Sequence, residues 1–176
     1  LALDYPKKNL EIIVVDDGST DRTLEKVRPF EKYGVKILHK KNGGKYTALN
    51  LGISQTGAPF IGSVDADSYV RPDALKNLMA HFNQPEVMAV ISTVKINQAK
   101  NLVEGIQYVE FLIASFLKKI YSILDSVFVT PGPLSVFRRE VFEKLGPYRK
   151  AYQTEDLEFG FRLQKADLKI AHAVDS

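Results

Sequence analysis

Three short apolar runs, each followed by a polar turn and a helix-like segment, constrain the fold of this chain most strongly. They span residues 11–15, 35–38 and 60–64, and a fourth apolar run spans 87–96. Consecutive strands joined by helices pair in parallel through right-handed crossovers. The pattern therefore predicts an α/β fold with a Rossmann-like, mainly parallel sheet flanked by helices.

Acidic residues stand where the first and third of these runs end. Asp16 and Asp17 follow the first run, and Asp65 and Asp67 follow the third. In open α/β sheets, ligands bind beyond the carboxyl ends of the strands. Two carboxylates plus substrate phosphate oxygens suit Mg²⁺ or Mn²⁺, although Asp is also common as a helix-capping residue in loops.

A glycine-rich turn precedes the second helix, which we expect over 45–54. In Asn42-Gly43-Gly44-Lys45, the glycines allow the backbone to approach a ligand, and Lys45 offers a charge to phosphate. Taken alone, such a turn is more often structural than functional.

The second half of the chain changes character. We expect a helix over 101–124, an extended segment over 126–137 that bends at Pro131-Gly132-Pro133, a helix over 139–145 and a strand over 169–174. A further helix over 154–165 has Thr154 as its expected N-cap. No internal linker is visible, so we expect one domain, 1–176, with a nucleotide-binding half (1–97) and an acceptor and catalytic half (98–176).

Composition excludes several classes of function. The net charge of +3 is too small to predict nucleic acid as the main partner, and a chain without cysteine has no disulfide or thiolate metal site. The most apolar stretch, 102–129, contains several charges, so it is not expected to cross a bilayer. The chain starts without Met, which predicts a fragment of a longer protein.

The order of the motifs is more specific than any one of them. Asp-Asp-Gly-Ser (16–19), Asn-Gly-Gly-Lys-Tyr-Thr-Ala-Leu-Asn (42–50), Asp-Ala-Asp (65–67) and Thr-Glu-Asp (154–156) follow one another at strand ends and helix starts. The chain resembles the family 2 glycosyltransferases, which have the GT-A fold. Residues 131–140 and 154–158 look like those of the membrane-associated polysaccharide synthases that make cellulose, chitin, hyaluronan or poly-N-acetylglucosamine.

The resemblance implies a role for each motif. Asp17, with Asp16, would contact the nucleotide, and Lys45 would lie by the nucleotide or its diphosphate. Asp65 would contact the donor and share the metal with Asp67, the more direct ligand. Asp156 would be the general base, with Glu155 as its rival beside the acceptor. Pro131, Gly132 and Pro133 would lie near the acceptor and the donor sugar.

The resemblance also implies a reaction and a location. The expected enzyme is an inverting hexosyl- or N-acetylhexosaminyltransferase that uses Mg²⁺ or Mn²⁺, a UDP-sugar by default, and a glycan or lipid-linked acceptor. The full-length protein would work at the cytoplasmic face of a membrane through segments absent from this soluble fragment. The family's opening Pro-x-Tyr-Asn strand and closing Gln-x-x-Arg-Trp motif are missing here, so the chain is expected to be truncated at both ends, and processivity is not predicted.

Other interpretations remain open at the level of sequence. A receiver-type phosphoacceptor domain, a sugar-nucleotide pyrophosphorylase and a catalytically silent nucleotide-sugar-binding domain also place acids at strand ends. His172 is expected to be structural rather than a metal ligand. The Arg138-Arg139 pair is expected to form a solvated helix start, with a place for Arg138 near a diphosphate as the alternative. The aromatic and aliphatic residues between 108 and 116 form either a membrane-facing surface or, as we favour, the face that packs on the sheet: Tyr108, Phe111, Leu112 and Phe116.

Overall fold

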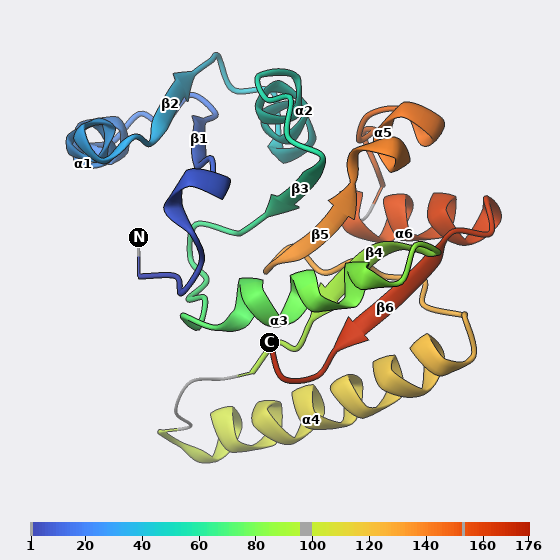
Figure 1. The fold of residues 1–176 in the computed structure, drawn as a ribbon. Coiled ribbons are helices and arrows are strands. Elements are labelled where there is room, and N and C mark those ends of the chain that lie inside the picture. The colour runs from blue at the N-terminus through green and yellow to red at the C-terminus, as the bar shows by residue number, and fades with distance from the viewer. Residues whose placement is uncertain (1, 96–99, 153) are drawn as a thin grey trace.

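A computed structural model describes residues 2–95, 100–152 and 154–176 (Figure 1). The strands are β1 (Ile13–Asp16), β2 (Lys36–His39), β3 (Phe60–Ser63), β4 (Val87–Ser92), β5 (Ser135–Arg138) and β6 (Lys169–Ala173). The α-helices are α1 (Thr23–Val27), α2 (Lys45–Ser54), α3 (Ala74–Ala80), α4 (Leu102–Ile123), α5 (Arg139–Leu145) and α6 (Glu155–Lys165). Three short 3₁₀ helices complete the set: η1 (Lys7–Asn9), η2 (Arg28–Tyr33) and η3 (His81–Asn83).

The strands form two sheets, and the α/β class is confirmed. β1 and β2 pair in parallel, while the second sheet has the order β3-β5-β4-β6. β4 and β6 are parallel, but β5 runs antiparallel to both of its neighbours. The antiparallel insertion of β5 was not predicted, because the segment before it contains the Pro131-Gly132-Pro133 bend and gave only an extended signal. β4 ends at Ser92, so the fourth strand is shorter than the expected 87–96, and residue 96 and the division at 97/98 lie outside the described residues.

Strand β4 is the central strand of the larger sheet. Five of its six residues are buried, and its continuous apolar sequence is typical of a strand covered on both faces. β5 pairs along one side, with Val136 opposite Val90, and β6 pairs along the other. The ends of β3, β5 and β4 are thereby fixed relative to one another.

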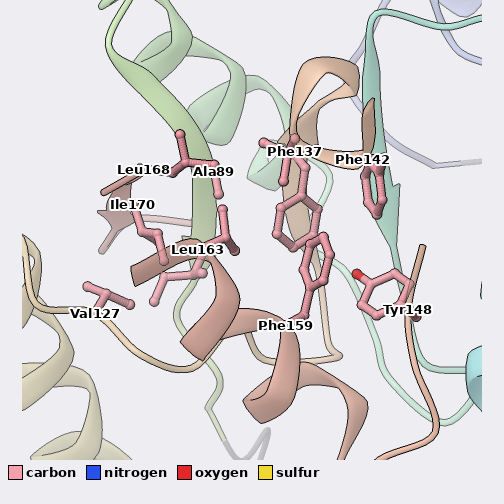
Figure 2. Packing of buried hydrophobic residues seen from close by; sticks show 11 residues of the cluster. Ala89, Val127, Phe137, Phe142, Tyr148, Phe159, Leu163, Leu168 and Ile170 are labelled. Atoms are coloured by element: carbon pink, nitrogen blue, oxygen red, sulfur yellow. The ribbon is translucent and has the colours of Figure 1, made fainter. Parts of the chain in front are cut away.

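The main hydrophobic cluster fixes α6 against this sheet (Figure 2). Phe159, on α6, is fully buried and stacks on Phe142 at 5.2 Å between ring centroids. Phe137 and Tyr148 also contact it, at 5.3 Å and 4.5 Å. Aromatic pairs of this kind add about 0.5–1.5 kcal/mol each beyond area burial, so the start of α6 is held by a rigid base.

Glycine permits a close approach on the other side of α6. A Cβ on Gly160 would overlap the carbonyl oxygen of Phe128 and lie 3.0 Å from the backbone nitrogen of Val129. The segment that leads to Pro131 therefore runs directly against α6.

Helix α4 runs along the outside of β6 (Figure 1). Its N-cap is Asn101, whose side chain accepts a hydrogen bond from the backbone N–H of Glu104. Tyr108, Leu112 and Phe116 are 39%, 42% and 66% exposed, so the expectation that this face packs on the sheet is wrong for them. None of the helices in the described ranges is long and apolar enough to cross a membrane.

Two local expectations are corrected by backbone and side-chain contacts. Thr154 precedes α6 without a capping side-chain bond. Arg138 lies at the start of α5, as its N-cap residue, but its side chain is not solvated there, because its guanidinium donates to the carbonyl oxygens of Val87 and Phe82. It also stacks on the Phe82 ring at 5.3 Å.

Candidate active site

A cavity of about 570 Å³ gathers residues from distant parts of the chain. Its lining comes from the start of α2, the turn after β3, the residues after β4, the middle of α4, the segment before β5 and the start of α6. The lining residues are Lys45, Asp65, Val94, Phe111, Lys118, Val129, Pro131, Gly132, Pro133, Thr154, Glu155 and Asp156.

Lys45 joins three of these segments through two ion pairs. Its Nζ lies 2.6 Å from Asp65 Oδ1 and 3.0 Å from Glu155 Oε1. Burial opposes the lysine's charge, but the hydrogen bonds with Asp65 and Glu155 outweigh it and raise the pKa of Lys45. Lys45 is therefore a cation that holds β3 and α6 to the N-terminus of α2.

The Pro131-Gly132-Pro133 segment lies directly against this ion pair. A Cβ on Gly132 would come within 2.5 Å of Asp65 Oδ2 and 2.9 Å of Lys45 Nζ. The segment's carbonyl groups are held by strand hydroxyls, since Ser135 Oγ donates to Pro131 O at 2.7 Å and Ser92 Oγ donates to Pro133 O at 2.8 Å. Leu134, which follows, adopts a left-handed φ of 73°. Such strain in a non-glycine residue is typical of functional sites.

Asp156 and Glu155 occupy different environments although they are adjacent. The Glu155 carboxylate is 17% exposed and is paired with Lys45. The Asp156 carboxylate accepts the backbone N–H of Leu157 at 2.8 Å, and its backbone carbonyl accepts the hydroxyl of Thr130 at 3.0 Å. Asp156 lines the cavity without an ion pair within 4.0 Å in the described part of the chain.

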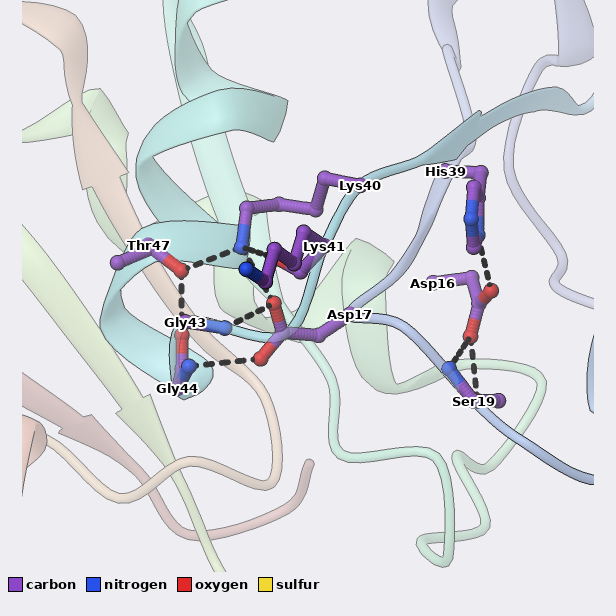
Figure 3. A network of polar contacts seen from close by, with 9 residues as sticks. All are labelled: Asp16, Asp17, Ser19, His39, Lys40, Lys41, Gly43, Gly44 and Thr47. Carbon is purple, nitrogen blue, oxygen red and sulfur yellow. Dashed lines mark hydrogen bonds and ion pairs between the residues drawn. The ribbon is translucent and has the colours of Figure 1, made fainter.

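Asp17 organises the loop that leads into Lys45 (Figure 3). Its carboxylate accepts hydrogen bonds from the backbone N–H groups of Gly43 and Gly44, at 3.1 Å and 2.8 Å, and pairs with Lys40 at 2.5 Å. The hydrogen bond from Lys40 is the main cause that lowers the pKa of Asp17. Asp17 is thus a carboxylate fixed beside the cavity rather than in its lining.

Asp16 has both carboxylate oxygens engaged inside the protein (Figure 3). One accepts from the hydroxyl and backbone N–H of Ser19, and the other lies 2.6 Å from His39 Nδ1. These bonds lower the pKa of Asp16, that from Ser19 most strongly, and its side chain is only 2% exposed. Ser19 is thereby held by Asp16, and the N-cap position of α1 is Arg22.

Asp67 lies on the turn after β3, which is closed by a hydrogen bond from the backbone N–H of Ser68 to the carbonyl of Asp65 at 3.0 Å. Asp67 is exposed and does not line the cavity. No three metal-ligating side chains among the described residues form a preformed cluster. Two carboxylates on one turn nevertheless fit a hard divalent cation that takes its remaining ligands from phosphate and water.

His172 is buried within the sheet and does not reach the cavity. It is 1% exposed, and its Nε2 lies 3.1 Å from the hydroxyl of Thr93. Burial, helped by the charges of Lys118 and Lys119, lowers the pKa of His172 to about 4. The structural interpretation of His172 agrees with this position.

Two residues that line the cavity, Lys118 and Phe111, were not assigned to the site from the sequence, and Asn50 was quoted only as the end of the 42–50 motif. Lys118 and Phe111 line the cavity from α4, a helix that showed only an apolar pattern with interspersed charges. Asn50 fixes the segment before α6, since its side-chain amide exchanges two hydrogen bonds with the backbone of Tyr148, at 2.8 and 2.9 Å. A lysine inside an otherwise apolar helical stretch was the available hint for Lys118.

Comparison with solved structures shows the GT-A fold. The chain superposes with a TM-score of 0.82 on a mannosyltransferase from Pyrobaculum calidifontis, solved with GDP-Man and Mn²⁺, at 24% identity. The match covers 99% of this chain and 48% of that one. TarS from S. aureus, solved with UDP-GlcNAc, gives a TM-score of 0.74 at 20% identity, covering 99% of this chain and 50% of that chain. The predicted GT-A fold is confirmed.

Comparison of sequences gives the family. A poly-β-1,6-N-acetyl-D-glucosamine synthase from Staphylococcus epidermidis is 29% identical over 176 residues, which cover 98% of this chain. The chain spans 42% of the length of that synthase. The model of the family described as "Glycosyl transferase family 2" matches residues 1–146. The chain therefore belongs to glycosyl transferase family 2.

Proposed function

We propose that this chain forms the donor-binding and catalytic core of an inverting, metal-dependent glycosyltransferase. Its donor would be a UDP-sugar, most simply UDP-N-acetylhexosamine, and its acceptor a glycan or a lipid-linked glycan. The observation that carries the proposal is the cavity in which Lys45, Asp65, Glu155 and Asp156 meet. Membership of family 2 removes the receiver-domain and pyrophosphorylase alternatives, whereas a silent sugar-nucleotide-binding domain is left to experiment.

Asp156 is the proposed general base. Its carboxylate faces the cavity without an ion pair, whereas that of Glu155 is paired with Lys45. A carboxylate held by a cation is a weaker proton acceptor, so the difference in surroundings favours Asp156. In this proposal the hydroxyl oxygen of the acceptor attacks the anomeric carbon on the side opposite the leaving nucleotide, and Asp156 accepts the proton of that hydroxyl.

The donor is proposed to lie across the ends of β1 and β3. Lys45 would hold the diphosphate, and the loop at 42–44 would form the wall beside the nucleotide. Asp17 shapes that wall, because its carboxylate accepts hydrogen bonds from the backbone N–H groups of Gly43 and Gly44. The buried carboxylate of Asp16 supports a role in holding the turn, so Asp17 is the residue proposed to meet the nucleotide.

Asp65 and Asp67 are proposed to hold Mg²⁺ or Mn²⁺. Asp65 already lies in the cavity, and Asp67 is exposed on the same turn. The mannosyltransferase that shares this fold was solved with Mn²⁺. Such an ion, when bound, would stabilise the negative charge of the departing diphosphate.

The acceptor is proposed to enter beside Pro131, Gly132 and Pro133. This segment borders the cavity between the Lys45–Asp65 pair and α6, and hydroxyl groups of β4 and β5 fix its carbonyls. The full-length protein would bring acceptor and donor together at the cytoplasmic face of a membrane, as the resemblance to polysaccharide synthases suggests.

The test compares Asp156→Asn with Glu155→Gln in the full-length protein. We expect Asp156→Asn to bind the donor normally in calorimetry but to slow single-turnover transfer by about 10²–10⁴-fold, the usual effect of a positioned base. Glu155→Gln should keep the rate of transfer within a few-fold of that of the unmodified protein, because the carboxylate of Glu155 forms an ion pair with Lys45. Normal transfer by Asp156→Asn beside an inactive Glu155→Gln would reverse the assignment, and no transfer by the unmodified protein would favour a silent binding domain.

A further inference from the structure

The cavity contains a cation that the proposed mechanism does not use. Lys118 projects from the C-terminal half of α4 and lines the same cavity as Asp156. Its neighbour Lys119 is exposed and is not part of the lining. The two lysines therefore differ in position although they are adjacent in sequence.

Lys118 has no ion-pair partner among the residues that the structure describes. No carboxylate there lies within 4.0 Å of its ammonium group. Burial lowers the pKa of Lys118, and the charge of Asp156 opposes that effect only in part. A half-buried ammonium without a partner is costly, so a ligand that brings a negative charge would be favoured there.

Lys45, the other lysine that lines the cavity, already has carboxylate partners and so offers a ligand less uncompensated positive charge than Lys118. Lys45 is held between Asp65 and Glu155, at 2.6 and 3.0 Å. Apolar groups make up much of the cavity lining that Lys118 shares, and Phe111 and Val94 are among them. Water is a weaker competitor for a charge in such surroundings than on an open surface.

We infer that Lys118 binds a phosphoryl oxygen of a substrate in this cavity, as a second cation beside Lys45. The inference rests on the proposed function, in which the reaction involves phosphate esters. Lysine is a common partner of phosphate oxygens because its compact ammonium acts as a point charge. Two substrates offer that chemistry: the diphosphate of the donor and the phosphate of a lipid-linked acceptor.

The experiment removes the positive charge of Lys118 while keeping a side chain of similar length. Lys118→Met, Lys118→Arg and the matched control Lys119→Met are made in the full-length protein, and folding is checked by circular dichroism. UDP and GDP are titrated by calorimetry, with uridine and guanosine as probes without phosphate. Transfer kinetics are measured with a neutral oligosaccharide acceptor and with a phosphate-bearing acceptor.

Each source of phosphate gives a different result. If the donor diphosphate is bound, Lys118→Met weakens nucleoside diphosphate binding by about 10- to 100-fold, the scale of one hydrogen bond to a charged group, and leaves nucleoside binding unchanged. If the acceptor phosphate is bound, only KM for the phosphate-bearing acceptor rises by that factor. In both cases Lys118→Arg retains most of the interaction, and Lys119→Met resembles the unmodified protein.

Lys118→Met that matches Lys119→Met in all of these measurements would overturn the inference. Should Lys118→Met fail to fold, Lys118→Gln is measured in its place under the same criteria. The proposed function fails separately, if the unmodified protein transfers no sugar from any nucleotide donor.

Discussion

Gly160 gives the sharpest test of how α6 is positioned. An alanine at this position would gain roughly 1 kcal/mol of helix propensity over glycine. Its Cβ, however, would overlap the carbonyl oxygen of Phe128 and lie 2.7 Å from the carbonyl carbon, both of them backbone atoms. Overpacking of this kind costs about 1–3 kcal/mol, so Gly160→Ala should change the free energy of unfolding by about 0 to −2 kcal/mol.

Gly105 provides the matched control. It also lies inside a helix, α4, but a Cβ there would meet nothing within 4 Å. Gly105→Ala should therefore gain up to about 1 kcal/mol, and the two variants should differ by about 1–3 kcal/mol. With a urea m-value of about 2 kcal/mol/M, that difference separates their unfolding midpoints by roughly 0.5–1.5 M.

The measurement is equilibrium urea unfolding of both variants under one condition. Equal shifts of both midpoints would refute the proposed contact between Gly160 and the backbone of Phe128. Transfer activity extends the test, because α6 begins with Glu155 and Asp156. A displaced α6 should slow transfer in Gly160→Ala, while Gly105→Ala should keep the normal rate.

Three further predictions address the site and the sheet. Gly132→Ala should displace the flexible side chains of Asp65 and Lys45 and so slow transfer by about 10²-fold, the effect of a misplacement of about 1 Å. Gly57→Ala is the control, because a Cβ there meets nothing within 4 Å, and it should leave transfer unchanged. Equal transfer rates in the two variants would contradict the contact between Gly132 and Asp65. Arg138→Lys should lower the free energy of unfolding in urea by about 2–4 kcal/mol, because the buried carbonyls of Val87 and Phe82 lose their donors. In the control Arg71→Lys, where Arg71 is an exposed partner of Asp73, the free energy of unfolding should change by no more than about 0.5 kcal/mol. His172 has a pKa of about 4 in the fold and about 6.5 when unfolded, so the unfolded chain binds more protons between these values. Its contribution is full above about pH 6.5 and falls by about 3 kcal/mol as the pH drops to 4; His172→Gln should flatten that part of the urea-midpoint curve, and an unchanged slope would contradict the assignment.

The local pattern of the sequence determined the elements and the order of the motifs. Apolar β-branched runs gave β1 to β4 and β6 within a few residues, and glycine and proline marked the ends of α2 and α5. Asp65 and Lys45 were singled out because acids at a strand end and a basic residue after a glycine turn are local features, whereas Asp156 was named through the resemblance to family 2 glycosyltransferases. Their meeting in one cavity follows from the strand order, which brings the ends of β3, β5 and β4 together.

Only the tertiary structure decided which partners and surroundings each of these residues has. Asp16 and Asp17 are neighbours in sequence, yet one is buried against Ser19 and His39 and the other shapes the loop before Lys45. Glu155 and Asp156 are equally acidic, but only Glu155 is within reach of Lys45. Lys118 became part of the site because α4 passes over the cavity, a contact between distant segments that no local pattern encodes. Periodicity and turn chemistry act over a few residues, whereas burial, ion pairing and cavity lining depend on which segments the fold brings together.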